Sequence, residues 1–252
     1  NSSKERLHDV QTQLATGLKI KNSSDDPVGF NRAARFRRII NRNDQFIRNI
    51  DNARGWIQTT EITLSEITDQ LLNAKTLATQ GSDSSMNTDN LQALADEVKG
   101  IIEDVVSMTN SRYLGKNIFA GTNTQNMESF TLDENYAVVY NGNTNSIDRK
   151  IGENTVLSIN INGEDLINTG VFSALTELNT ALESGDISAI SATIDTITTA
   201  HTKVVDITVS VGELLTRLEL AEEHFTLANM NLTANLSNIE DIDMAEAVMA
   251  FN

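Results

Sequence analysis

The residues with the most obvious capacity for chemistry in this chain are arginines near its N-terminal end. Six of them lie within a short stretch: Arg32, Arg35, Arg37, Arg38, Arg42 and Arg48. In a helix, Arg35, Arg38 and Arg42 share one face through spacings of three and four. Such a face can bind acidic side chains, and candidates on a neighbouring copy are Glu213, Glu219, Glu222 and Glu223. The alternative is a solvated face with a few weak intrahelical ion pairs, and the residues alone leave both open.

No set of residues has the spacing of a catalytic or metal site. His8, His201 and His224 are the only histidines, and they form no ligand pair. The chain has no Cys, which excludes thiol chemistry and cysteine-ligated metals. Carboxylates such as Asp25-Asp26 and Glu222-Glu223 are adjacent, so on a helix they do not face each other. Phosphate-cradling glycine loops are absent. The sequence therefore predicts no catalytic residue, no metal and no cofactor.

Charge is divided unevenly along the chain. The net charge is -16, yet residues 1–60 carry eleven Lys or Arg against six Asp or Glu. Opposite charge on two halves is typical of a nucleic-acid patch, or of two surfaces of one assembly that attract each other. A nucleic-acid-binding coiled coil would use the arginines, but few aromatics lie among them and the acidic remainder would repel phosphates. No apolar stretch is long enough to span a membrane.

Two long helices must position these residues. We expect the first to follow the polar loop of residues 21–27, with Asp26 as N-cap and Pro27 at the first helical position, and to continue to about Gln80. A shorter amphipathic helix should precede it, from about Lys4 to Leu18. The second long helix should extend from about Asp186 to Ile239. Each would be roughly 80 Å long.

Both long helices carry apolar residues at every seventh position. The C-terminal column is Ile190, Ile197, Val204, Val211, Leu218, Phe225, Leu232 and Ile239, and the N-terminal column is Ile50, Ile57, Leu64, Leu71 and Ala78. A repeat of seven undershoots the helix period, so each column stays on one seam only if the helix supercoils around a partner. We expect the two helices to pack antiparallel as a helical rod.

The middle of the chain changes character. After a helix from about Asp89 to Asn110 come β-rich runs at 136–140 and 155–159, with hairpin signals at Asn141-Gly142, Gly152 and Asn162-Gly163. Helical periodicity returns after Gly170. We therefore predict a mainly α fold with a small antiparallel β insertion. Residues 1–122 and 171–252 would form a discontinuous helical rod domain, and residues 123–170 a small β-rich domain that projects outward.

Several motifs in this order resemble bacterial flagellins and, more closely, the hook–filament junction proteins of that family. They are Leu14-Ala15-Thr16-Gly17, Ser24-Asp25-Asp26-Pro27-Val28, Asn49-Ile50-Asp51-Asn52-Ala53-Arg54, Asn117-Ile118-Phe119-Ala120-Gly121-Thr122, Arg217-Leu218-Glu219 and Ile239-Glu240-Asp241. Filament flagellins usually read Asp-Asp-Ala-Ala-Gly where this chain has Asp25-Asp26-Pro27-Val28-Gly29, so Pro27 and Val28 favour the junction proteins. A filament flagellin remains the first alternative.

The resemblance implies a structural protein of the flagellum, an adaptor ring that joins hook to filament and templates flagellin assembly. Implied partners are neighbouring copies, the other hook-associated junction protein, flagellin and an export chaperone, with no nucleic acid and no membrane. The resemblance also implies secretion through the flagellar type III export channel to an extracellular location. Asp25, Asp26, Pro27 and the arginine face would set the register between subunits. We read the chain as trimmed at both ends and expect it not to polymerise by itself.

Overall fold

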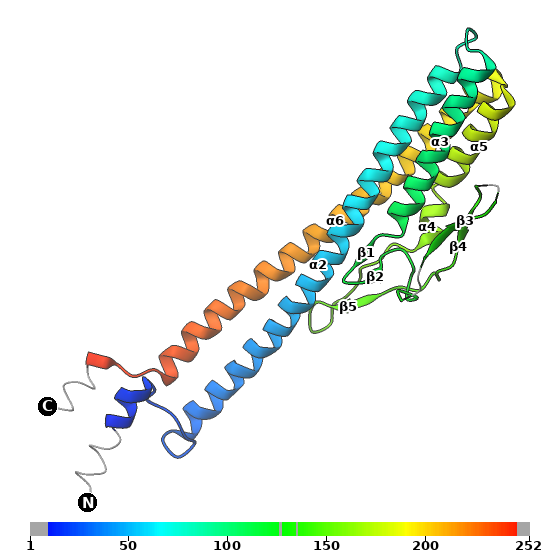
Figure 1. Ribbon diagram of the computed structural model, residues 1–252. Coiled ribbons are helices and arrows are strands. Elements are labelled where there is room, and N and C mark those ends of the chain that lie inside the picture. The colour runs from blue at the N-terminus through cyan, green and yellow to red at the C-terminus, as the bar shows by residue number, and fades with distance from the viewer. Residues whose placement is uncertain (1–9, 126–127, 135, 246–252) are drawn as a thin grey trace, which may run out of the picture. The chain divides into compact units, whose positions relative to one another are not determined.

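The computed structural model describes residues 10–125, 128–134 and 136–245 (Figure 1). The fold is mainly α with small antiparallel strand pairs, as predicted. The helices are α2 (Pro27–Gly81), α3 (Thr88–Thr109), α4 (Gly163–Ile167), α5 (Val171–Ser184) and α6 (Ile187–Glu240). The chain divides into unit 1, from residues 1–49 and 220–252, and unit 2, from residues 50–219. Both ends of the described chain belong to unit 1, and every described strand belongs to unit 2.

Local signals set the helix ends close to their predicted positions. The Val28 amide donates a hydrogen bond to Asp26 Oδ1 at 3.0 Å, so Asp26 caps α2 and Pro27 opens it. Asn87 caps α3 through the Asn90 amide at 2.8 Å. The predicted helix from Lys4 to Leu18 falls partly outside the described residues, and its described part is helical over residues 10–16.

In unit 2 the seven-residue columns form the core. Ile57, Leu64 and Leu71 of α2 are at most 1% exposed, and so are Ile197, Val204 and Leu218 of α6. Ile50, Ala78, Ile190 and Val211 are equally buried. Figure 1 shows α3 and α5 alongside the C-terminal part of α2 and the N-terminal part of α6, where a helical bundle covers the columns. Nearer to residue 50, Tyr113 packs on Trp56 of α2. Burial of such columns contributes about 25 cal/mol per Å² of apolar area.

In unit 1 the same two helices pack antiparallel but less completely. The rings of Phe46 and Phe225 lie 5.2 Å apart, and Asn43 donates a hydrogen bond to Asn229 at 2.9 Å. From Phe46 to Asn43 the residue number falls along α2, while from Phe225 to Asn229 it rises along α6. The two helices are therefore antiparallel, as predicted. Phe225, Leu232 and Ile239 are only half-buried here. The column is thus a closed core in unit 2 and a partly open seam in unit 1.

The described strands form three separate antiparallel ribbons, and the first of them precedes the predicted insertion of residues 123–170. They are β1 (Arg112–Tyr113) with β2 (Lys116–Asn117), β3 (Phe130–Leu132) with β4 (Val138–Tyr140), and β5 (Asp148–Lys150) with β6 (Val156–Ser158). The hairpin predicted around Gly152 is confirmed, because it joins β5 to β6. The other two hairpin predictions are wrong. Asn141-Gly142 lies between two ribbons that do not pair with each other.

Asn162-Gly163 starts helix α4 instead of closing a hairpin. The Asn162 side chain accepts from the Asp165 amide, and the Asp165 carboxylate accepts from the Asn162 amide. This reciprocal pair is a capping box, which satisfies two amides that the first helical turn leaves without partners. An Asn-Gly dipeptide is common in tight turns, but here Asp165, three positions after Asn162, completes the capping box, so a helix begins at Gly163.

Asn110, which follows the last residue of α3, fastens the β3–β4 ribbon to the helices. Its Oδ1 accepts hydrogen bonds from the amides of Ser129 at 2.7 Å and Phe130 at 3.0 Å. Its Nδ2 donates to the carbonyl of Phe130 at 2.8 Å. One amide side chain therefore replaces a missing strand partner for the start of β3.

We expect Asn110→Ala to destabilise unit 2 by about 2–4 kcal/mol. The change leaves partly buried backbone groups of Ser129 and Phe130 without hydrogen-bond partners, and each such group costs about 1–3 kcal/mol. Urea denaturation followed by circular dichroism measures the loss. Asn141→Ala is the matched control, since Asn141 is exposed and, among the described residues, its side chain bonds only Thr131, at 3.3 Å. Equal midpoints for the two variants would contradict the role of Asn110.

Candidate assembly surfaces

The polar loop before α2, in unit 1, is held together by hydrogen bonds to a carboxylate within it. The Asp25 carboxylate accepts hydrogen bonds from the amides of Asn22 at 2.9 Å and Lys21 at 3.0 Å. Ile20 is buried against the first turn of α2, where a Cβ on Gly29 would collide with Ile20 and Asp26. The loop and that turn border an open hollow of about 670 Å³ lined by Lys21, Asp25, Arg32 and their neighbours. The predicted contact residues Asp25, Asp26 and Pro27 are all exposed.

We expect this loop to loosen at low pH. Hydrogen bonds from the Asn22 and Lys21 amides hold the pKa of Asp25 below its ordinary value of 3.8. A carboxyl group with a lowered pKa in the folded state stabilises that state above its ordinary pKa, and the effect fades as the pH falls through the lowered value. The Lys21 and Asn22 amide signals in NMR spectra should therefore shift together below about pH 4. Signals that stay fixed down to pH 2 would show that the carboxylate does not hold the loop.

The two ends of the described chain are joined within unit 1. The Ile242 amide donates to the Gly17 carbonyl at 3.0 Å, and the Lys19 amide donates to the Glu240 carbonyl at 2.5 Å. Arg37 forms an ion pair of 2.6 Å with Glu240, whose side chain is only 4% exposed. Arg37 thus serves the fold itself, although it belongs to the arginine cluster seen in the sequence.

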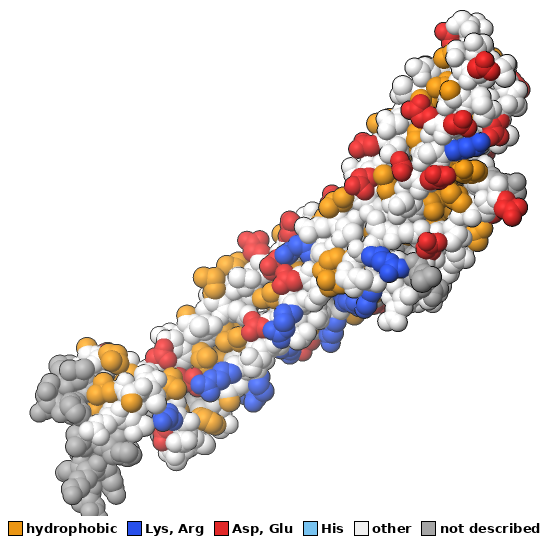
Figure 2. Space-filling model, in the orientation of Figure 1, with side chains coloured by type: hydrophobic (Ala, Val, Ile, Leu, Met, Phe, Trp, Pro, Cys, Tyr) orange, Lys and Arg blue, Asp and Glu red, His pale blue; other side chains and the backbone are white. Residues whose placement is uncertain are grey.

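The arginines predicted to contact other subunits are on the surface. Arg32, Arg35, Arg38 and Arg42 are exposed on α2. Figure 2 shows several Lys and Arg side chains spread along the α2 part of unit 1. The Arg32 guanidinium lies 5.8 Å from the centre of the Phe36 ring. Arg35 and Arg38 make no ion pair with any described residue.

The acidic candidates lie on α6. Glu213 and Glu219 are exposed and belong to unit 2, whereas Glu222 is half-buried in unit 1. Around α3 and α5 of unit 2, most of the charged side chains visible in Figure 2 are Asp and Glu.

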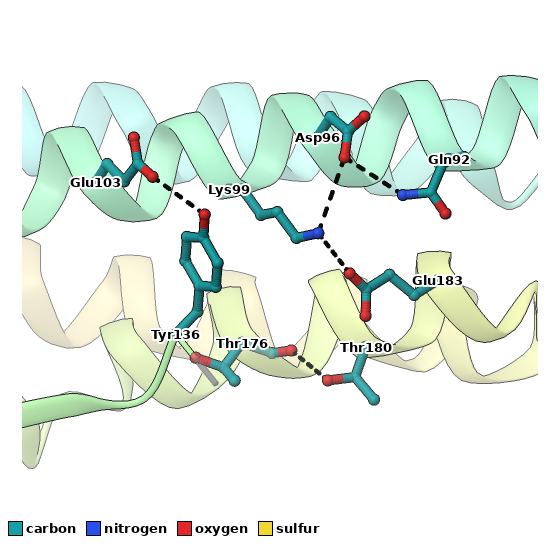
Figure 3. A network of polar contacts seen from close by, with 8 residues as sticks. All are labelled: Gln92, Asp96, Lys99, Glu103, Tyr136, Thr176, Thr180 and Glu183. Atoms are coloured by element: carbon teal, nitrogen blue, oxygen red, sulfur yellow. Dashed lines mark hydrogen bonds and ion pairs between the residues drawn. The ribbon is translucent and has the colours of Figure 1, made fainter. Parts of the chain in front are cut away.

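Lys99, in the acidic part of unit 2, forms ion pairs with carboxylates of the same chain. Lys99 of α3 lies 2.6 Å from Glu183 of α5 and 3.8 Å from Asp96, and the hydrogen bond to Glu183 raises the pKa of Lys99 (Figure 3). The Tyr136 hydroxyl is 3.2 Å from Glu103 on the same helix. Since Lys99 is held by these two carboxylates, the surrounding surface keeps its negative character.

The described residues contain no cluster of side chains that could hold a metal ion. No group of three or more His, Asp or Glu side chains converges among them. His201 is half-buried on α6, His224 is exposed beside the Phe225 ring, and His8 lies outside the described residues. None of the described helices combines the length and apolar character that a membrane crossing needs.

Sequence reasoning missed the polar side chains that organise the β ribbons. The Tyr140 hydroxyl lies 2.9 Å from the Phe119 carbonyl and 2.8 Å from the Asn143 carbonyl, and it accepts from the Gly163 amide. Burial raises the pKa of Tyr140. Asn110 acts across twenty residues of chain. The one signal available beforehand was the Asn-x-x-Asp pattern at 162–165, which matches a capping box.

The chain matches two parts of one protein family. The bacterial flagellin N-terminal helical region matches residues 1–124, and the bacterial flagellin C-terminal helical region matches residues 194–252. A flagellin from Halalkalibacterium halodurans is 26% identical over 244 residues, which cover 95% of this chain and 79% of that protein.

Solved structures share the fold. A protein from Vibrio parahaemolyticus assigned as flagellar hook-associated has a TM-score of 0.78 at 17% identity, covering 86% of this chain and all of that one. Bacillus cereus FlgL has a TM-score of 0.70 at 22% identity, covering 80% and 98% of the two chains. Flagellin from the same organism has a TM-score of 0.52 at 19% identity, covering 71% and 88%.

Paired long helices with heptad seams and exposed charged faces are typical of structural proteins that assemble through their helices. The chain belongs to the bacterial flagellin family. It is a structural component of the flagellum and not an enzyme.

Proposed function

We propose that this protein is an adaptor at the junction of hook and filament, where a ring of copies joins the two tubes and templates flagellin assembly. The observation that carries this proposal is a contrast within one organism. The fold of this chain is closer to Bacillus cereus FlgL than to Bacillus cereus flagellin. Pro27 and Val28 in Asp25-Asp26-Pro27-Val28-Gly29, where filament flagellins usually have Asp-Asp-Ala-Ala-Gly, support the same assignment.

Subunit register in such a ring would depend on the loop and arginine surfaces of unit 1. Arg35 and Arg38 are exposed, and the carboxylates of Glu213 and Glu219 are exposed as well. Because each copy carries both surfaces, contacts between the arginines of one copy and the carboxylates of the next can repeat around a ring. Charge complementarity of this kind provides specificity more than affinity. Residues 123–170 would project outward from the ring.

The proposed partners are neighbouring copies, the other hook-associated junction protein, flagellin and an export chaperone. The protein would reach its extracellular place through the flagellar export channel. A filament flagellin is the alternative, because the curated relative described above is itself a flagellin. Nucleic-acid binding has no support from the comparisons.

Electron microscopy of purified hooks tests the proposal. Full-length protein is added to hooks, first alone and then followed by flagellin. An adaptor should add a short, self-limiting zone at the hook tip, and filaments should grow only after that zone forms. Long filaments from this protein alone would identify it as a flagellin. Bovine serum albumin in place of the protein is the negative control.

A further inference from the structure

The turn between β1 and β2 carries an exposed leucine in an unfavourable backbone conformation. Leu114 has φ 49° and Gly115 has φ 76°. Two consecutive positive φ angles in a two-residue hairpin loop define a type I′ turn, whose first position is usually Asn, Asp or Gly. Leucine there brings its Cβ close to a backbone carbonyl oxygen. Its side chain is 77% exposed, so packing within the chain does not compensate for the strain.

The hairpin below this leucine is firmly anchored. Tyr113 packs against the Trp56 ring of α2 at 6.2 Å, in an edge-on arrangement. Immediately after β2, Ile118 and Phe119 are completely buried. The Arg112 Nε donates to Asn117 Oδ1 at 2.9 Å across the ribbon. Leu114 is therefore a fixed apolar knob, and exposed Arg112 and Lys116 lie on either side of it in the chain.

A matching surface exists on α2 in the same unit. Ile62 is 60% exposed and Leu72 is 47% exposed. With Asp69 between them, spacings of seven and three place these residues on one stripe of the helix, about 15 Å long. Asp69 and the neighbouring Glu66 are both exposed. The stripe offers apolar contact and negative charge, which complement the apolar tip and the positive charge of the hairpin.

We infer that the Leu114 knob of one copy docks on the Ile62–Asp69–Leu72 stripe of a second copy. Knob and stripe are different surfaces of one chain, so the contact is head-to-tail and generates a ring or a helical array. The retained strain is then explained by apolar area that becomes buried only in the assembly. This inference rests on self-association and holds for a junction ring and for a filament alike.

Photo-cross-linking of the full-length protein in cells tests the contact directly. With p-benzoylphenylalanine at position 114, flagella exposed to ultraviolet light should yield dimer-sized adducts containing the tryptic peptide of residues 55–75. The same amino acid at position 156 is the control, because Val156 is also exposed, at 58%, and lies outside the proposed contact. Adducts from position 114 to a different peptide would refute the inference. So would their absence from flagella that incorporate the protein.

The Leu114→Asn variant tests the contact between copies independently of the stability of the fold. Asparagine suits the turn, so the midpoint of thermal unfolding should rise by about 2–4 °C, while incorporation into flagella falls about tenfold. Val156→Asn should leave incorporation unchanged. Asp69→Lys should also impair incorporation, and Lys116→Glu in the same chain should restore it. Normal incorporation of Leu114→Asn would overturn the inference. Growth of long filaments by the unaltered protein would overturn only the junction role.

Discussion

A protein with Arg35→Glu and Arg38→Glu should fold normally but fail to assemble into the flagellum. Both side chains are exposed and unpaired with the described residues, so their replacement should change the free energy of unfolding by less than about 0.5 kcal/mol. Arg38 and Arg42 also repel each other across one helical turn, and Arg38→Glu removes that repulsion. If the arginine face meets carboxylates of a neighbouring copy, the double change places like charges together, which costs several kcal/mol.

Such a cost lowers the affinity between copies by roughly two orders of magnitude or more. Swimming in soft agar and incorporation of the protein at hook tips are the measurements. Lys150→Glu with Lys203→Glu is the matched control, because it changes the net charge equally at two exposed positions that belong to neither proposed contact surface. Wild-type motility of the Arg35/Arg38 variant would refute the proposed role of this face. A lower melting temperature would instead assign the arginines to the fold.

Phe130→Ala should be among the most damaging changes in unit 2, with a loss of about 3–5 kcal/mol in the free energy of unfolding. The Phe130 side chain is completely buried at the start of β3. Its ring lies 5.0 Å from that of Tyr140 on the paired strand and 5.3 Å from that of Phe172 on α5. Truncation leaves a cavity at the point where the ribbon meets the helices, and the aromatic pairs disappear with it.

Chemical denaturation of purified Phe130→Ala gives this loss. The control is Val139→Ala on strand β4, where the side chain is 45% exposed and the expected loss is below about 1 kcal/mol. Hydrogen exchange locates the effect, since the amides of β3 and β4 should lose protection before those of α2 do. Equal losses for the two variants would mean that Phe130 does not join the ribbon to the bundle.

The helices were predictable because their signals are local. Asp26 and Pro27 mark a helix start through chemistry within one turn, and a repeat of seven marks a buried seam wherever it occurs. The mainly α class, both long helices and the short helix after Gly170 therefore agree with the structure. The exposure of the arginines and of most of the glutamates also follows from periodicity, since they lie off the apolar seam. Their assembly role stays a prediction.

Tertiary structure decided what depends on partners distant in the chain. Column residues with the same spacing are buried in unit 2, where α3, α5 and the β ribbons pack on the two long helices, and partly open in unit 1. The sequence determined by itself which residues form helices and which face of each helix is apolar, because these depend on neighbours within a few positions. Only the folded chain determined that Arg37 pairs with Glu240, that Asn110 holds β3, and that Leu114 stands exposed on an anchored turn. These features depend on which segments, far apart in the sequence, lie next to each other in the folded chain.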